Sequence, residues 1–190
     1  MTQEQEAITR LKRGDIGGLE WLVECYQVEA RQAAYLITGN YALAEDLVQS
    51  AFVRAYERIH QFDAGRPFGP WFLRSVINDA RMAVTRRVNV SLDSQDETGT
   101  LSRDELVSLD PGLYEVFEAM QTREAIWAAL DKLSPEQRAA IVMHYYLDLN
   151  SVEISQLLLV PSGTVRRRLH DARHKLRRLL PGWIRPPASE

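Results

Sequence analysis

SVEISQLLLVPSGTVRRRLHDARHKLRRLL, residues 151–180, is the stretch that decides the fold class of this chain. Its pattern predicts a helix, a turn at Pro161 and a second helix rich in arginine. The apolar residues of the second helix recur at steps of four and three: Val165, Leu169, Ala172, Leu176 and Leu179. This spacing makes one apolar stripe on a helix of 3.6 residues per turn, and cationic side chains occupy the remaining faces. Such a helix, entered through a short turn, is typical of a helix-turn-helix that binds the DNA major groove.

Charge is segregated along the chain. The 190 residues carry 23 Lys and Arg against 26 Asp and Glu, and this net charge of -3 alone would argue weakly against nucleic-acid binding. Residues 163–185, however, hold eight Arg or Lys against one Asp, a net of +7, and residues 64–88 hold five arginines. Residues 89–122 hold eight Asp or Glu against Arg103 alone, a net of -7. Two basic blocks separated by an acidic one indicate two polyanion-binding surfaces and an acidic tether.

Cysteine and histidine usage argues against a metal site, a cofactor or an enzyme. Cys25 is the single cysteine, so neither an intramolecular disulfide nor a CxxC metal site can form. It lies in an amphipathic helical stretch, where we expect it to pack rather than to sense redox state. The four histidines form no HExxH or other metal-binding spacing, and no nucleophile motif is present. We therefore expect no metal, no cofactor and no catalytic residues.

No run of about 18 apolar residues exists in the chain, so we expect no membrane insertion. The first residues, MTQEQEAITRLKRGD, lack the apolar core of a signal peptide. The single cysteine also fits a reducing compartment. The expected location is the cytoplasm.

Helical spacing dominates the rest of the sequence, and no strand-like alternation interrupts it. Helices are predicted over 4–13, 15–37, 44–59 and from about 68 to 87, with breaks at Gly39-Asn40 and at 63–67. Farther on, Ser134-Pro135 is a strong helix start, and Asn150 or Ser151 can cap the next helix. We predict an all-α protein of two small helical domains, 1–88 and 122–183, joined by a flexible acidic linker at 89–121.

Two blocks of sequence carry a family resemblance. The first is AEDLVQSAFVRAYERIHQFD (44–63) followed by RPFGPWFLRSVINDARMAVTRR (66–87), and the second covers 133–180, with LSPEQR and the helix-turn-helix. Together they resemble the extracytoplasmic-function (ECF) group of sigma-70 family sigma factors, the bacterial RNA polymerase subunits that recognise promoters. The first block is similar to sigma region 2 and the second to sigma region 4. Two matching blocks in the right order are far more specific than a helix-turn-helix alone.

The resemblance implies a surface for core RNA polymerase. In the family, a helix with a D-x-x-Q-x-x-F pattern docks on the largest polymerase subunit, and here the pattern is Asp46, Gln49 and Phe52. The alternative is a solvated face for Asp46 and Gln49. Phe52 fits a core position better than a contact.

The resemblance also places contacts to the promoter -10 element in the block at 66–87. Opening a promoter means extracting a base from the stack, which requires a shaped pocket, polar groups for the base edge and cations for the single strand. Asn78 matches an asparagine of the family pattern W-L-x-R-I-x-x-N, here WFLRSVIN, and shares one helix face with Arg74 and Arg81. For the apolar residues of the block, a core position is the alternative. The candidate -10 residues are Phe68, Trp71, Arg74, Asn78 and Arg81.

Region 4 would bind the -35 element with its second helix. Side chains near the start of that helix are expected to reach bases, and those farther along to touch phosphates or point to solvent. For any single arginine, a solvent-exposed position without a DNA contact is the alternative. The candidate -35 residues are Ser162, Thr164, Arg166, Arg167, Arg168, His170 and Arg173. The turn departs from the family pattern, because Leu159 stands where a glycine is common.

These features predict an ECF-type sigma factor that binds core RNA polymerase and directs initiation at specific promoters. The implied partners are core polymerase, promoter DNA and an anti-sigma factor that masks the free protein. One alternative is a helix-turn-helix DNA-binding regulator that acts without core polymerase. The block at 44–87 argues against this alternative, because a simple repressor would not need it.

Overall fold

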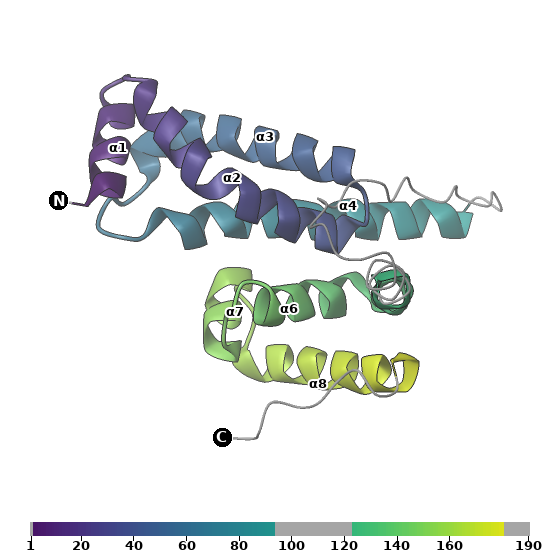
Figure 1. The fold of residues 1–190 in the computed structure, drawn as a ribbon. Helices are drawn as coiled ribbons and strands as arrows, with labels where there is room; N and C mark the ends of the chain where they lie inside the picture. Colours follow the sequence, from purple (N-terminus) through teal and green to yellow (C-terminus); the bar gives the residue numbers. More distant parts are fainter. Residues whose placement is uncertain (1, 94–122, 181–190) are drawn as a thin grey trace, which may run out of the picture.

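The computed structural model describes residues 2–93 and 123–180, and every regular element within these ranges is a helix. The helices form two layers, one built from the first four α-helices and the other from the C-terminal ones (Figure 1). This arrangement confirms the predicted all-α fold with two small helical domains. Most of the predicted acidic linker, 89–121, lies outside the described residues.

Local signals mark several of the helix boundaries in the first domain, with the end of α4 as the exception. It contains α1 (Gln3–Lys12), α2 (Gly17–Thr38), α3 (Tyr41–Arg58), the short 3-10 helix η1 (Ile59–Gln61) and α4 (Phe68–Asp93). Gly39 ends α2 in the left-handed region at φ 69°, which a residue without Cβ adopts readily. The Asn40 side chain then accepts a hydrogen bond from the Leu43 N–H at 2.9 Å and starts α3. α4 continues to Asp93, beyond the predicted end near Arg87, so the helix enters the predicted linker.

The second domain contains a helix at 123–131, α6 (Pro135–Tyr145), α7 (Ser151–Leu158) and α8 (Ser162–Leu179). Ser134 and Gln137 form a capping box, in which each side chain accepts a hydrogen bond from the backbone N–H of the other, both at 3.2 Å. Asn150 caps α7 by accepting from the N–H groups of Val152 and Glu153. The helix starts predicted at Ser134 and Asn150 are therefore confirmed.

An aromatic cluster holds α4 against its neighbours in the first domain. Phe68 and Phe72 of α4 are fully buried. Phe72 stacks on Phe52 of α3 with ring centroids 4.2 Å apart, and the Phe68 ring lies 5.5 Å from that of Tyr26 on α2. Burial of one large apolar side chain contributes roughly 1.5–3 kcal/mol. The cluster therefore fixes the position of the start of α4 relative to α2 and α3.

Cys25 is exposed, so the expectation that it packs in the core is wrong. The buried stripe of α2 passes through Leu22 and Ala30, at steps of four through the half-buried Tyr26. Cys25 precedes Tyr26 by one residue, about 100° around the helix, which turns it toward solvent.

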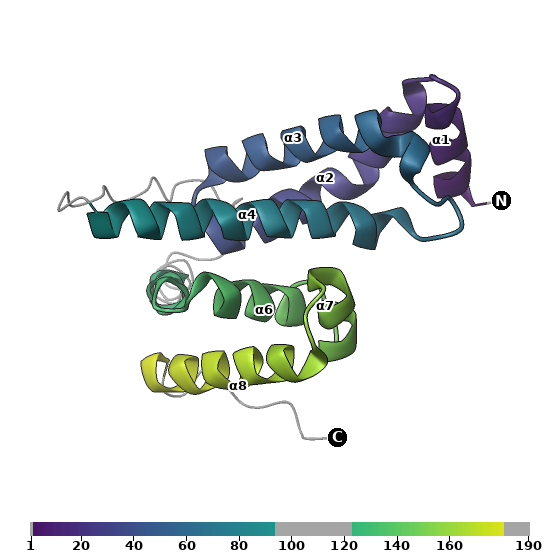
Figure 2. The same ribbon diagram turned by 180° about the vertical axis from the view of Figure 1, so that it is seen from behind.

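The two domains meet along α2, α4 and α6 (Figure 2). Arg138 of α6 is the polar centre of this seam, with a side chain only 6% exposed. Its Nε donates a hydrogen bond to the Leu36 carbonyl near the end of α2 at 2.6 Å, and its Nη1 contacts Asp131 Oδ1 at 2.8 Å. Its guanidinium also lies over the Trp127 ring, 5.4 Å from the centroid. The positive group thus meets a carbonyl in the last turn of α2, where the helix dipole favours a cation.

Candidate nucleic-acid and polymerase interfaces

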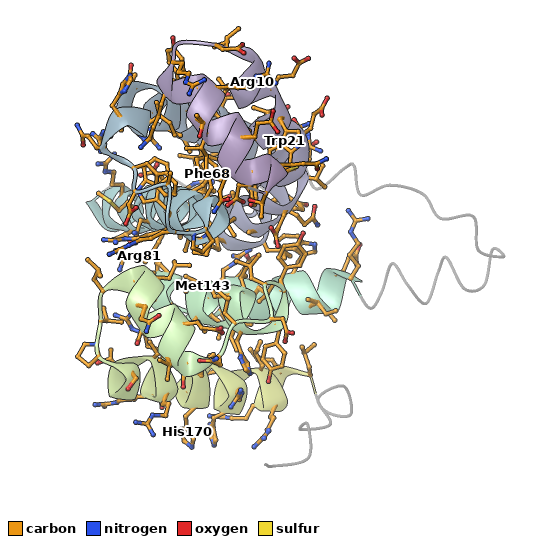
Figure 3. The ribbon with its side chains drawn as sticks, turned by 90° about the vertical axis from the view of Figure 1, so that its left-hand side faces the viewer. Arg10, Trp21, Phe68, Arg81, Met143 and His170 are labelled. Atoms are coloured by element: carbon orange, nitrogen blue, oxygen red, sulfur yellow. The ribbon has the colours of Figure 1, made fainter. Side chains whose placement is uncertain are left out.

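α8 presents its cations outward, as the sequence pattern predicts. Val165, Leu169, Ala172 and Leu176 are buried against the second domain. Figure 3 shows His170 at the outer edge of the molecule, directed away from the first domain. The exposed cationic and imidazole side chains of this helix include Arg166, Arg167, His170, His174, Arg177 and Arg178. Within the described residues, no other helix covers this outer face of α8.

The cations of α8 differ in what they contact. Arg173 is tied to α6, because its Nε donates to the Tyr145 hydroxyl at 3.0 Å and its guanidinium lies 5.6 Å from the centre of the Tyr145 ring. Arg167 forms only a long pair with Asp171 at 3.9 Å and keeps a side chain that is 87% exposed. Arg166 is exposed, whereas Arg168 is half-buried. Arg166 and Arg167, the two arginines predicted to contact bases, are therefore the most accessible of the candidate -35 arginines.

The start of α8 brings Ser162 and Thr164 close to these arginines, and both are half-buried. The turn before it is set by Leu159, which adopts the left-handed conformation at φ 53° and ψ 44°. Leu159 is also 69% exposed, so no burial of its side chain offsets the strain. The turn of the helix-turn-helix is retained even though a leucine replaces the glycine that is common there.

Two grooves flank the predicted -10 residues. One, of about 550 Å³, lies between the start of α4 and α7. A smaller one, of about 160 Å³, lies between α3 and α4 and includes Asn78 and Ser75. Trp71 and Arg74 line both. The structure therefore brings Trp71, Arg74 and Asn78 together on one side of α4.

Arg54 and Arg58 of α3 also line the smaller groove, although neither was among the residues predicted for the -10 element. Arg54 pairs with Asp79 of α4, which orients it toward Asn78 and its neighbours. The available signal was a pair of arginines four residues apart on one helix, which places both on the same face. Nothing in the sequence alone shows that this face meets α4.

Two of the predicted -10 residues, Phe68 and Arg81, do not line the smaller groove between α3 and α4. Phe68 has no exposed surface, because it lies at the first residue of α4 in the centre of the aromatic cluster. It supports the groove from beneath, and a direct contact with DNA is not available to it in this arrangement. Arg81 is half-buried, and Figure 3 places it on the side of α4 that faces the second domain.

The predicted polymerase-contacting residues lie on α3. Asp46 and Gln49 are exposed, whereas Phe52 is buried at 7% exposure under them. Gln49 and Phe52 line a groove of about 240 Å³ between α2 and α3. One exposed apolar side chain, Val53, continues this face and is 57% exposed. The face thus combines the exposed polar groups of Asp46 and Gln49 with a groove that is lined partly by apolar residues.

The described residues hold neither a metal-binding cluster nor a membrane-spanning helix. No group of three His, Cys, Asp or Glu side chains within 2–93 and 123–180 could hold a metal ion. In the same ranges, every helix is too short or too polar to cross a bilayer.

Comparison with known proteins defines the class of protein. Residues 22–89 match the model of Sigma-70 region 2, and residues 123–176 match the model of Sigma-70 region 4. The ECF RNA polymerase sigma factor SigW of Bacillus subtilis is 31% identical over 93% of this chain and 96% of its own length. The chain belongs to the ECF group of sigma-70 family RNA polymerase sigma factors, which confirms the predicted family.

Solved structures share the fold. The structure of CnrH in complex with the cytosolic domain of CnrY matches 96% of this chain and 100% of that chain, with a TM-score of 0.66 and 22% identity. The sigma factor RpoE in complex with the anti-sigma factor NepR from Bartonella quintana matches 87% of this chain and 98% of that chain, with a TM-score of 0.65 and 21% identity. At this level of identity the likeness concerns the fold alone.

Proposed function

We propose that this ECF sigma factor binds core RNA polymerase through α3, engages the -10 element with α4 and reads the -35 element with α8. The observation that carries the proposal is the presence of two separate cationic faces in one chain, on α8 and on the α3–α4 groove. A helix-turn-helix regulator that acts alone needs only the first of them. The membership of the sigma factor family supports the same assignment.

At the -35 element, the exposure of Arg166 and Arg167 supports contacts to base edges, together with Ser162 and Thr164 at the helix start. Arginine pairs with guanine through two parallel hydrogen bonds in the major groove. The remaining candidate -35 residues are proposed to contact phosphates: Arg168, His170 and Arg173. Arg173 can make such a contact only with the N–H groups that Tyr145 leaves available.

At the -10 element, the smaller groove between α3 and α4 is lined by Trp71, Arg74 and Asn78. This supports these three residues as the ones that meet the unpaired strand. An aromatic face, a cation and an amide supply stacking, charge neutralisation and hydrogen bonding to a base. Arg81 becomes available to the strand when the second domain moves away from α4. Phe68 keeps the groove in shape from the core.

Further partners follow from the same assignment. Two structural neighbours were solved as complexes: CnrH with the cytosolic domain of CnrY, and the sigma factor RpoE with the anti-sigma factor NepR. An anti-sigma factor is therefore proposed as a partner of this chain as well. The protein works in the cytoplasm, where core polymerase and promoter DNA are found, and it has no catalytic role of its own.

The polymerase surface is tested by replacing Asp46 and Gln49 together with alanine. Core binding, measured by fluorescence anisotropy with labelled protein, should weaken about tenfold or more if both side chains contact the polymerase. Gln3→Ala with Glu6→Ala is the matched control, because it removes one exposed amide and one exposed carboxylate from α1. Unchanged core binding by the α3 variant would count against this docking site.

A further inference from the structure

α1 holds both ends of the loop that joins α3 to α4, although it lies outside the matched region 2, residues 22–89. The Lys12 ammonium donates a hydrogen bond to the Phe62 carbonyl at 2.6 Å, just after η1. At the other end, the Glu4 carboxylate accepts one from the Phe68 N–H at 3.0 Å, at the first residue of α4. These two contacts join positions that are 50 and 64 residues apart in the sequence.

Each contact satisfies a backbone group that the helices leave open. The first N–H groups of a helix lack partners within it, and a carboxylate there also benefits from the helix dipole. Glu4 thus caps α4 from outside. Its second oxygen accepts a hydrogen bond from the Tyr26 hydroxyl, and burial together with this bond raises the pKa of that hydroxyl above its ordinary value. The carboxylate is therefore held in place on two sides.

Between the two fixed ends, the loop closes on itself. The Asp63 side chain accepts from the Gly65 N–H at 3.0 Å and pairs with the Arg66 guanidinium at 3.5 Å. The Arg66 N–H donates to the Asp63 carbonyl at 3.0 Å. The loop residues from Asp63 to Pro67 are exposed or half-buried, and several of them line the larger groove beside Trp71 and Arg74. The loop thus forms the first-domain side of that groove, next to Trp71 and Arg74, while residues of the second domain such as Glu153 and Gln156 form the other side.

The docking of α1 itself does not depend on Glu4 or Lys12. Ala7, Ile8 and Leu11 bury the apolar face of α1 against the first domain. The backbone of α1 also approaches α2 closely, since a Cβ at Gly18 would lie 2.2 Å from the Ala7 carbonyl oxygen. Lys12 and Glu4 are only half-buried. Loss of their polar groups would therefore release the loop while α1 stays in place.

We propose that Glu4 and Lys12 are positioning residues for -10 recognition, which act by fixing the loop between Phe62 and Phe68. The inference rests on the proposed function, in which the face of Trp71 and Arg74 meets the unpaired -10 strand. A loop held at both ends keeps its shape when the second domain moves away, so little ordering of the loop remains to be done when the strand binds. α1 is then part of the promoter-melting apparatus although it touches no DNA.

The test uses full-length protein with core polymerase on a duplex promoter that the wild type transcribes. Promoter melting is followed by permanganate reactivity of unpaired thymines, and base preference by sequencing transcripts from a library randomised at -10. Lys12→Met keeps the aliphatic stem and removes the donor, whereas Lys12→Arg keeps a donor. Arg10→Met is the matched control, because Arg10 lies on the same helix and its ion-pair partner among the described residues is Asp15, at 2.8 Å, and not the loop. A second variant, Glu4→Ala, removes the contact at the other end of the loop.

Lys12→Met, which removes one hydrogen bond, should slow melting about threefold to tenfold and flatten the -10 base preference. Glu4→Ala removes two hydrogen bonds and should have an effect at least as large. The affinity for core polymerase and the base preference at -35 should stay unchanged in both variants. Lys12→Arg, which keeps a donor, should melt the promoter like the wild type. On a template whose -10 element is already unpaired, the two variants should differ less from the wild type. If Lys12→Met and Glu4→Ala both melt the promoter and select -10 bases as Arg10→Met does, that result would overturn the inference. So would a loss of core affinity in parallel with melting, since that would show a purely structural role.

Asn78→Ala separates this inference from the proposed function. If Asn78→Ala loses base preference at -10 while Lys12→Met does not, the inference fails and the proposed -10 face stands. If Asn78→Ala and Arg74→Ala both melt and select promoters as the wild type does, the proposed -10 face fails, and the inference fails with it.

Discussion

The arginines of α8 are chemically alike, and their surroundings divide their roles. Arg166 and Arg167 are exposed near the start of the helix, whereas the guanidinium of Arg173 is engaged by Tyr145. The sequence predicted the cationic face from the buried stripe alone. It could not assign Arg173 to Tyr145, because the two residues lie 28 positions apart on different helices.

Replacement of Arg166 or Arg167 by alanine should weaken binding to a -35 duplex by about 1–3 kcal/mol if either makes a bidentate guanine contact. The loss should be largest for the preferred sequence. Arg177→Ala, in the last turn of α8, should instead lower the salt dependence of binding with little change in base preference. Anisotropy titrations against salt, with matched and mismatched duplexes, measure both effects. Equal and sequence-independent losses at all three sites would refute a base-reading role for Arg166 and Arg167.

The sequence predicted several helix boundaries correctly, because a helix cap depends on a few neighbouring residues. Ser134 and Asn150 start α6 and α7 as predicted, and Gly39 ends α2. The end of α4 was predicted too early. Residues after Arg87 are polar and β-branched, with weak helix propensity, and nothing local shows that the helix continues to Asp93.

The left-handed backbone of Leu159, in the turn between α7 and α8, leads to a prediction about stability. Leu159→Gly should raise the free energy of unfolding by about 0.5–1 kcal/mol, because relief of left-handed strain exceeds the entropy cost of glycine. Urea denaturation monitored by circular dichroism measures it. Asp148→Gly is the control: Asp148 also has a positive φ, 51°, but aspartate tolerates that conformation better. A loss of stability in Leu159→Gly would show that the exposed leucine contributes more than the turn strain costs.

The packing of one domain on the other could not be predicted from the sequence. Arg138 reaches Leu36 across 102 positions, and an arginine in a helix is usually solvated.

The contact between the two domains also affects how the protein can bind a promoter. The -10 and -35 elements lie about 85 Å apart at 3.4 Å per base pair, far more than two domains in contact can span. The domains are therefore expected to separate on the promoter.

Arg138→Met should loosen the closed arrangement, since the Leu36 carbonyl and Asp131 lose their buried partner, at a cost of about 1–3 kcal/mol. Small-angle X-ray scattering of the free protein should show a larger radius of gyration. Lys132→Met, at an exposed position just before α6, is the matched control and should leave the radius unchanged. An unchanged radius for Arg138→Met would show that apolar contacts alone hold the seam.

The central claim is that this chain confers promoter specificity on core RNA polymerase. Run-off transcription with purified core polymerase, on the DNA upstream of the gene that encodes this chain, tests it most directly. We expect a discrete transcript that appears only when the protein is added and that Asp46→Ala with Gln49→Ala reduces. Absence of both a transcript and core binding would contradict the claim and leave a DNA-binding regulator in its place.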